Sequence, residues 1–179
     1  MTFWEDFLKA VEALNSAGVA YVVCGGVACM LYGIDRQTVD VDVIVRPSSH
    51  APERLHAEFR KRGFDVSLED LRSAAGKSSH VSALTKGGYV VDIKFASTDL
   101  DFRTLDGKVA LKLDDLVVFV APLEELVTAK IAVLGSLKDL EDALTLITMH
   151  KESLNFERLE KLLGKSVRDA VREQLGGLR

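Results

Sequence analysis

The segment from Val39 to Val45 restricts the fold of this chain more than any other. It reads Val-Asp-Val-Asp-Val-Ile-Val, so acidic and apolar residues alternate over its first half. Side chains at alternate positions of a β-strand point to the same face, so Asp40 and Asp42 share one face. The opposite face is expected to enter a core, and it consists of Val39, Val41, Val43 and Val45. The segment therefore predicts a strand with one apolar and one acidic face.

Asp40 and Asp42 suggest a site for a cation. Two neighbouring carboxylates repel each other, and burying them without a partner is costly. A divalent cation removes that conflict, and carboxylate-rich sites suit Mg²⁺ or Mn²⁺, which also bind substrate phosphates. The alternative is a pair of solvent-facing side chains on a half-exposed strand. The residues just upstream favour the cation site.

A glycine turn precedes this strand. Residues 22–23 are β-branched valines, which predict a strand that ends at Gly25-Gly26. The apolar residues 27–32, followed by Gly33, are typical of a short buried helix. A helix that begins after two glycines has free backbone N–H groups, which a phosphate can approach closely.

Together these residues resemble the nucleotidyltransferase superfamily, which includes polymerase beta, kanamycin nucleotidyltransferase and the minimal nucleotidyltransferases of toxin–antitoxin loci. The family pattern is an apolar residue, Gly, then Gly or Ser, a spacer, and Asp-apolar-Asp/Glu-apolar. The matching residues here are Cys24-Gly25-Gly26, the spacer 27–39, and Asp40-Val41-Asp42-Val43. The loop 35–38, Asp-Arg-Gln-Thr, is similar to the Arg-x-Thr-x-Asp form of small members, including AbiEii-like toxins.

The family also has a third carboxylate on a later strand, and Asp92 in the alternating segment 89–95 fits that position. By this resemblance, Asp40, Asp42 and Asp92 are the catalytic residues and the metal ligands. The nucleotide-binding residues that the resemblance implies are Gly25, Gly26, Arg36, Thr38, Lys130, Lys138 and Asp139.

The last three of these belong to a pattern in the helical C-terminal part. Small nucleotidyltransferases have a lysine on one helix and Lys-Asp-x-x-Asp on the next, and this chain has Lys130 and then Lys138, Asp139 and Asp142. The resemblance implies that Lys130 faces the triphosphate and that the motif braces the site. The alternative for the motif is a solvated helix face with local ion pairs, each contributing about 0.2–0.5 kcal/mol.

The resemblance implies an α+β fold with a mixed β-sheet flanked by helices and a helical C-terminal part. It implies transfer of a nucleoside monophosphate from a nucleoside triphosphate to an acceptor hydroxyl, with pyrophosphate release, in an enzyme of toxin–antitoxin type. The implied cofactor is Mg²⁺ or Mn²⁺. The acceptor stays open between a protein side chain, an RNA end and a small molecule.

Two other functions stay open. One is a non-catalytic nucleotide- or partner-binding module, such as an antitoxin or a regulator, although a pure binding role gives no reason to keep three aspartates together. The other is a phosphohydrolase that uses the same metals. The chain also departs from the family: residues 27–32 lack the basic residue of polymerase-like members, and Ser136-Leu137 replace an arginine of some relatives. Both differences reduce the positive charge available to a triphosphate.

Composition sets the remaining limits. The chain has 179 residues, of which 47% are hydrophobic, so it can form a sizeable core. We expect a catalytic core over residues 1–121 and C-terminal helices, packed on it, over 122–179. A net charge of −4 argues against general nucleic-acid binding. The N-terminus does not resemble a signal peptide and no apolar run approaches about 18 residues, so we expect a cytoplasmic protein without membrane contact.

Residue patterns predict the other elements. Helices are expected at 3–17, 52–61, 123–131, 137–150, 154–163 and 167–175, and strands at 80–85, 89–95 and 116–120. Residues 64–79 are expected to form a loop or an edge segment, and Asp99, Asp101 and Asp106 to lie in a loop. Cys24 and Cys29 are expected to be buried, reduced thiols. The terminal helices are expected to pack on the core or to form a homodimer contact.

Overall fold

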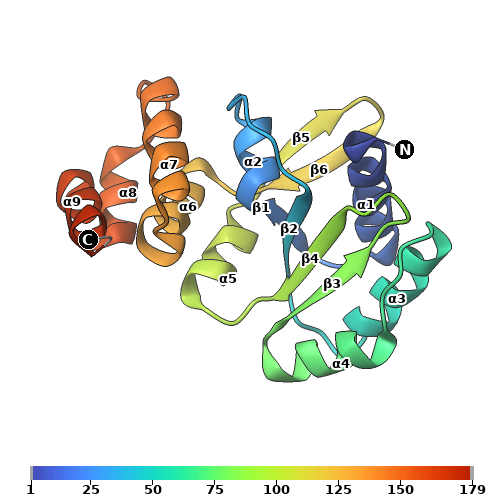
Figure 1. Cartoon of the computed structure of the whole chain (residues 1–179). Coiled ribbons are helices and arrows are strands. Elements are labelled where there is room, and N and C mark those ends of the chain that lie inside the picture. Colours follow the sequence, from blue (N-terminus) through green and yellow to red (C-terminus); the bar gives the residue numbers. More distant parts are fainter. Residues whose placement is uncertain (1, 178–179) are drawn as a thin grey trace.

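The computed structural model describes residues 2–177, which contain a six-stranded mixed sheet (Figure 1). The strands lie in the order β3-β4-β2-β1-β6-β5. β2 is parallel to β4 and β1 to β6, whereas the other neighbouring pairs are antiparallel. The strands are β1 (Tyr21–Cys24), β2 (Asp40–Val45), β3 (His80–Leu84), β4 (Val90–Phe95), β5 (Val109–Leu113) and β6 (Leu116–Val120). The expected α+β fold with a mixed sheet is confirmed.

Helices cover both faces of this sheet (Figure 1). On one face, α1 (Phe3–Ala17) packs against α3 (Ala51–Lys61), which packs against α4 (Leu68–Lys77). On the other face lie α2 (Gly25–Leu31) and α5 (Asp99–Asp106). The sheet therefore has one face closed by three helices and one face that looks toward the C-terminal part of the chain.

The alternation of β2 and β4 produces the core as predicted, with one exception. The core-facing side chains of these strands are at most 3% exposed: Val41, Val43, Val45, Val91, Ile93 and Phe95. Val39, however, is 66% exposed, because β2 begins only at Asp40. The expectation that Val39 points into the core was wrong, since the strand alternation does not extend to this residue.

The C-terminal helices form a compact group beside the sheet (Figure 1). α6 (Leu123–Thr128) is buried along its whole length and continues as a π-helix, η1 (Ala129–Leu134). α6 packs on α8 (Phe156–Leu163), and η1 packs on α7 (Leu137–Met149) and α9 (Val167–Gly177). The division of the chain at residue 122 into two parts stays a prediction.

Two segments that we expected to be loops are helices. Residues 68–77 form α4, which begins where the Ser67 hydroxyl accepts a hydrogen bond from the backbone N–H of Asp70. Residues 99–106 form α5, which begins with a capping box between Thr98 and Asp101. Both sequences carry an N-cap signature, and their small and polar composition concealed the helices.

Two further findings concern membrane contact and the cysteines. Within residues 2–177, no helix is long and apolar enough to span a membrane. Cys24 and Cys29 are free thiols; Cys29 is buried and Cys24 is half-buried.

Candidate active site

Three aspartates lie on one face of two neighbouring strands. β2 and β4 are parallel, and their register pairs Asp42 with Asp92. Asp40 precedes Asp42 by two residues and therefore shares its face. On the other side of Asp92, Ser82 of β3 is its antiparallel partner, and the Ser82 hydroxyl donates a hydrogen bond to Oδ1 of Asp92. The sheet thus brings together carboxylates from segments that are far apart in the sequence.

Asp42 lies at the centre of this acidic face and has a perturbed pKa. Burial, followed by repulsion from Asp40 and Asp92, raises the pKa of Asp42 from 3.8 to about 6. A hydrogen bond from the backbone N–H of Gly26 acts in the opposite direction and stabilises the ionised form. The carboxyl group is therefore still ionised at neutral pH, but at an electrostatic cost that a cation would relieve.

The glycine turn at the start of α2 positions Asp42. Gly25 has a φ of +61°, in the left-handed region that favours glycine. A Cβ atom at Gly25 would lie 1.8 Å from Oδ2 of Asp42, so no other residue leaves this carboxylate in place. Together with the Gly26 N–H, this turn forms a close-fitting seat for the central aspartate. The binding of phosphate by Gly25 and Gly26 stays a prediction.

Gly26 also lets the loop before β2 approach the turn. A Cβ atom at Gly26 would lie 3.0 Å from Oγ1 of Thr38 and 3.1 Å from Nη2 of Arg36. The Thr38 hydroxyl donates a hydrogen bond to Oδ1 of Asp40. The Arg-x-Thr part of the motif therefore contacts both the glycine turn and the first aspartate.

Arg36 and Lys130 share an acidic partner on α7. Lys130 is 2% exposed, and its Nζ lies 2.7 Å from Oδ2 of Asp142 and 3.0 Å from Oδ1 of Asp139. Arg36 also donates to Oδ2 of Asp142, through Nη1. Burial alone would lower the pKa of Lys130, but the hydrogen bonds from its ammonium group to Asp142 and Asp139 raise it. These residues form a charged cluster that joins three separate parts of the chain.

The residues of the Lys-Asp-x-x-Asp motif have different surroundings. Asp139 and Asp142 bind the buried Lys130, so these two are not a solvated face. Burial raises the pKa of Asp139, but the Ser136 hydroxyl and Lys130 outweigh this effect and hold it below its usual value. Lys138, by contrast, is exposed on the first turn of α7, and its predicted role in nucleotide binding stays a prediction.

Lys94 and Asp101 were not predicted as site residues. Lys94 lies two positions after Asp92 on β4, and its Nζ is 2.8 Å from Oδ1 of Asp101 on α5. Asp101 is 4% exposed and also accepts hydrogen bonds from the backbone N–H groups of Ser97 and Thr98, each at 3.0 Å. The Thr-x-x-Asp capping signature at 98–101 was the signal that could have located it.

A pocket opens beside the acidic face. Its volume is about 490 Å³, within the range of small-molecule sites, roughly 300–1,000 Å³. Asp42 and Asp92 line it from the sheet, Lys94 from β4 and Lys130 from η1. The pocket therefore brings Asp42 and Asp92 together with Lys94 and Lys130.

The three carboxylates suit a hard divalent cation in their chemistry. Among residues 2–177, no three His, Cys, Asp or Glu side chains stand in the arrangement of a metal centre. One oxygen of Asp40 accepts a hydrogen bond from Thr38, and one oxygen of Asp92 accepts a hydrogen bond from Ser82. All the available donors are carboxylate oxygens, which Mg²⁺ and Mn²⁺ prefer, and the raised pKa of Asp42 reflects unrelieved negative charge.

The sequence matches no protein-family model and no curated protein. Solved structures do resemble the fold. The antibiotic-resistance factor ANT(2'')-Ia is 13% identical, with a TM-score of 0.55 over 96% of this chain and 92% of that protein. An antigenic nucleotidyltransferase-like protein from Paracoccidioides brasiliensis is 20% identical, with a TM-score of 0.52 over 96% of this chain and 85% of that protein.

ANT(2'')-Ia was also solved in complex with adenylyl-2''-tobramycin, and that structure is 15% identical with a TM-score of 0.53. These similarities extend over most of each chain. The fold of this chain is therefore that of the nucleotidyltransferase superfamily.

Proposed function

We propose that this chain transfers a nucleoside monophosphate from a nucleoside triphosphate to an acceptor hydroxyl, with release of pyrophosphate. The observation that carries the proposal is the register of β2 and β4, which places Asp42 beside Asp92 with Asp40 on the same face. The pocket against this face can hold a small substrate. The similarity to nucleotidyltransferase structures supports the same reaction class.

Asp40, Asp42 and Asp92 would hold the Mg²⁺ or Mn²⁺ ions. Bound there, such ions supply positive charge to the triphosphate and lower the pKa of an acceptor hydroxyl. The seat formed by Gly25 and Gly26 keeps the central carboxylate at one position. A ligand that is fixed before substrate binds contributes to catalysis without reorganisation during the reaction.

The chain's own residues then act on the acceptor and on the leaving group. Asp92 accepts the proton of the acceptor hydroxyl, and the hydrogen bond from Ser82 to Oδ1 orients that carboxylate. The acceptor oxygen forms a bond to the α-phosphorus while the bond from that phosphorus to the bridging oxygen breaks, and pyrophosphate leaves. Arg36 and Lys130 are the cations placed to compensate the leaving charge. Both are paired with Asp142, so phosphate oxygens compete with this carboxylate for them.

This pairing also favours the rival function. If Asp142 retains both cations, the pocket binds a nucleotide or a partner without turning it over, as an antitoxin or a regulator would. Both lysines that line the pocket, Lys94 and Lys130, are in ion pairs with carboxylates of the same chain. A toxin–antitoxin role, an antitoxin partner, a homodimer and a cytoplasmic location stay predictions.

Calorimetric titration of each nucleoside triphosphate tests the proposal. We expect the native chain to bind one or more of them only when Mg²⁺ is present, and Asp42→Asn to abolish that binding. Asp65→Asn is the control, because Asp65 is an exposed carboxylate in a surface ion pair with Arg60 and should bind like the native chain. Absence of binding by the folded native chain at millimolar nucleotide would contradict the proposal.

A second measurement separates the enzyme from the binding module. Asp92→Asn removes the group that accepts the proton, so we expect it to reduce pyrophosphate release by at least about a hundredfold. The readout is pyrophosphate formed on incubation with candidate acceptors. Binding that depends on Asp42, without pyrophosphate release with any protein, RNA or small-molecule acceptor, would support the binding module.

A further inference from the structure

The pocket beside the acidic face has an apolar wall that the proposed chemistry leaves unused. The side chains that form it come from β2, α5, α6 and η1, and they are Ile44, Leu100, Leu126, Ala129, Val133 and Leu134. Leu126 is 2% exposed, whereas Val133 and Leu134 are 65% and 56% exposed. The wall therefore runs from a buried residue of α6 to an exposed apolar lip at the end of η1.

This lip is an unusual place for large apolar side chains. Val133 and Leu134 are consecutive, and both line a pocket that also contains two of the three aspartates. Exposed apolar surface that is continuous with a polar site marks a binding surface for a ligand or a partner. The wall also belongs to η1, and π-helical segments inside longer helices frequently occur at functional sites.

The charges beside this wall disfavour a polyanionic acceptor, because both lysines that line the pocket already have carboxylate partners. Lys94 is paired with Asp101, and Lys130 is paired with Asp139 and Asp142. The remaining charged groups that line the pocket are carboxylates, among them Glu125, which is paired with Arg158. A phosphate backbone would therefore meet negative charge and apolar surface.

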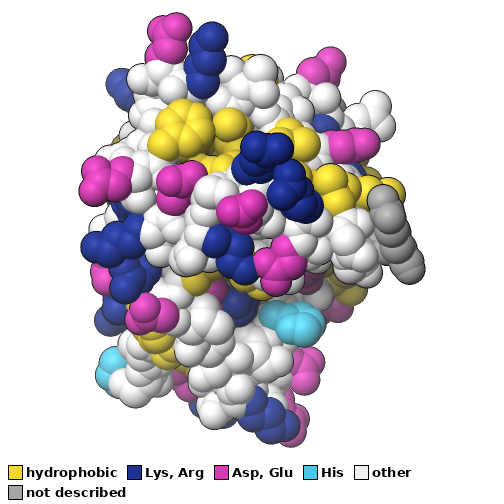
Figure 2. Space-filling model, turned by 90° about the vertical axis from the view of Figure 1, so that its left-hand side faces the viewer, with side chains coloured by type: hydrophobic (Ala, Val, Ile, Leu, Met, Phe, Trp, Pro, Cys, Tyr) yellow, Lys and Arg dark blue, Asp and Glu magenta, His cyan; other side chains and the backbone are white. Residues whose placement is uncertain are grey.

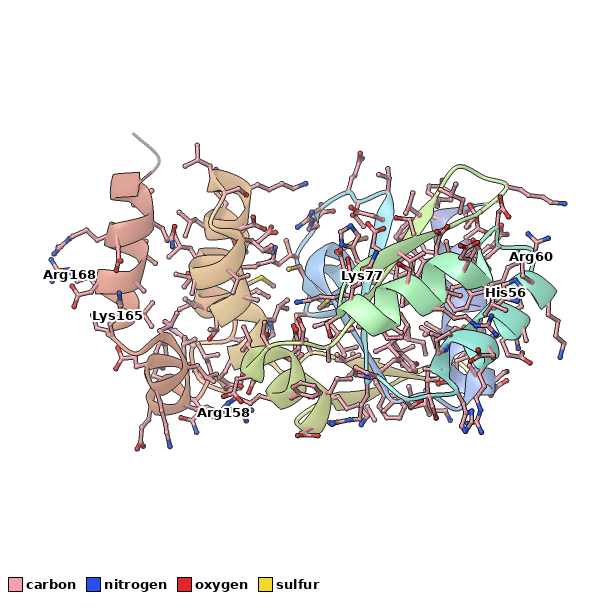
Figure 3. The ribbon with its side chains drawn as sticks, turned by 90° about the horizontal axis from the view of Figure 1, so that it is seen from below. His56, Arg60, Lys77, Arg158, Lys165 and Arg168 are labelled. Carbon is pink, nitrogen blue, oxygen red and sulfur yellow. The ribbon has the colours of Figure 1, made fainter. Side chains whose placement is uncertain are left out.

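The outer surface also argues against a long nucleic acid as the acceptor. On the face that carries the C-terminal helices, basic and acidic side chains are interspersed around apolar ones, without a continuous basic stripe (Figure 2). Seen from below, Arg60 of α3 and Arg168 of α9 lie at opposite ends of the molecule (Figure 3). Recognition of a long RNA normally uses a basic patch or stripe on one face. The acidic balance of the whole chain agrees with this argument.

We propose that the acceptor is a small alcohol with an apolar body. Its hydroxyl reaches Asp92, where it loses its proton and bonds to the α-phosphorus as pyrophosphate leaves. Its aromatic or aliphatic body lies on Leu126, Val133 and Leu134. This inference rests on the proposed transfer for the reaction and on the apolar wall for the class of acceptor.

The test uses benzyl alcohol as the probe and leaves out the nucleotide, so it does not depend on the transfer reaction. Methyl-labelled native protein is titrated with benzyl alcohol and with glycerol at millimolar concentrations, and the methyl NMR signals are followed. We expect benzyl alcohol to shift the signals of Leu126, Val133 and Leu134, and glycerol to leave them unchanged. The pocket is then a site for apolar alcohols whether or not the chain turns over a nucleotide.

Two leucine variants locate the binding. Leu134→Gln replaces the exposed lip, and we expect it to weaken benzyl alcohol binding by about fivefold or more, because the ligand loses apolar contact. Leu144→Gln is the matched control: Leu144 is 45% exposed on α7 and does not line the pocket, so its variant should bind like the native chain. Gln is a good helix former, so both variants should stay folded.

Four outcomes would overturn the proposal. One is the absence of shifts at these three residues, and another is an equal loss of binding in the two variants. A third is saturation of the same methyl groups by Mg²⁺ and a nucleoside triphosphate with exclusion of the alcohol, which would assign the wall to the nucleobase. The fourth is concentration-dependent broadening of these signals without probe, which would assign the wall to a second copy of the chain.

Discussion

Substitution of Gly25 by alanine is the sharpest test of how the site is built. Gly25 has a φ of +61°, and an added Cβ would lie 1.8 Å from Oδ2, 2.6 Å from Cγ and 3.0 Å from Cβ of Asp42. Rotation of the carboxylate alone cannot relieve three such contacts. We therefore expect Gly25→Ala to displace the whole Asp42 side chain and to abolish Mg²⁺-dependent nucleotide binding.

The loss of stability has two parts. A non-glycine residue in the left-handed region costs about 1–2 kcal/mol. Displacing Asp42 breaks the hydrogen bond from the Gly26 N–H to an ionised group, which costs about 1.5–3 kcal/mol, partly offset by relief of repulsion among the aspartates. We expect Gly25→Ala to lower the free energy of unfolding by about 2–4 kcal/mol.

Gly18→Ala is the matched control, measured by urea denaturation and by calorimetric nucleotide titration. Gly18 has the same φ of +61°, but the nearest atom to an added Cβ is Nη1 of Arg54 at 3.8 Å, an ordinary contact. This variant should lose only the backbone part of the stability, about 1–2 kcal/mol, and keep nucleotide binding. The reasoning would be refuted if Gly25→Ala lost no more stability than Gly18→Ala and bound the nucleotide equally well.

Four more predictions follow from the charged groups and from the cap of α4. Asp42 has a pKa of about 6 in the folded chain, above its ordinary value of 3.8, so in metal-free buffer folding takes up a proton between these two pH values. The free energy of unfolding should therefore fall as pH rises through this window. Asp42→Asn should remove that part of the pH dependence, measured by urea denaturation. Asp139, whose pKa is lowered, provides the opposite sign: its contribution is present at neutral pH and is lost as pH falls through its folded pKa, so Asp139→Asn should lose stability at neutral pH. Lys130→Met should lower the free energy of unfolding by about 3 kcal/mol, because Asp139 loses its lysine partner and the buried Asp142 keeps only Arg36. A loss below about 1 kcal/mol would contradict the buried cluster. Ser67→Ala should lower it by about 1 kcal/mol through the lost α4 cap, and an unchanged urea midpoint would show that this cap contributes nothing.

Local periodicity was sufficient to predict much of the sheet and the shared face of Asp40 and Asp42. The alternation in β2 placed Asp40 and Asp42 on one face and buried Val41 and Val43, because the two-residue period is a property of the strand backbone. The same alternation predicted a buried Val39, but this valine lies outside the strand and is exposed. The mixed sheet with flanking helices, which the resemblance to nucleotidyltransferases implied, was also confirmed.

Composition misled the prediction where capping chemistry decided the structure. Residues 68–77 and 99–106 contain small and polar residues, so both were expected to be loops. Each begins with a side chain that bonds the backbone N–H three residues later, Ser67 in one case and Thr98 in the other. A cap satisfies N–H groups that would otherwise lack partners, and this can outweigh a weak apolar pattern.

Only the tertiary structure decided how the charged residues combine. The sequence alone showed two aspartates on one strand and lysines and aspartates on later helices, and the resemblance suggested that they meet. The pairing of Asp42 with Asp92 depends on the register of β2 and β4, and the contact of Arg36 with Asp142 depends on how α7 packs against the loop before β2. Strand register and helix packing are set by long-range burial and hydrogen bonding, whereas the period of a strand is set within a few residues, so the sequence by itself determined the faces and the fold determined the site.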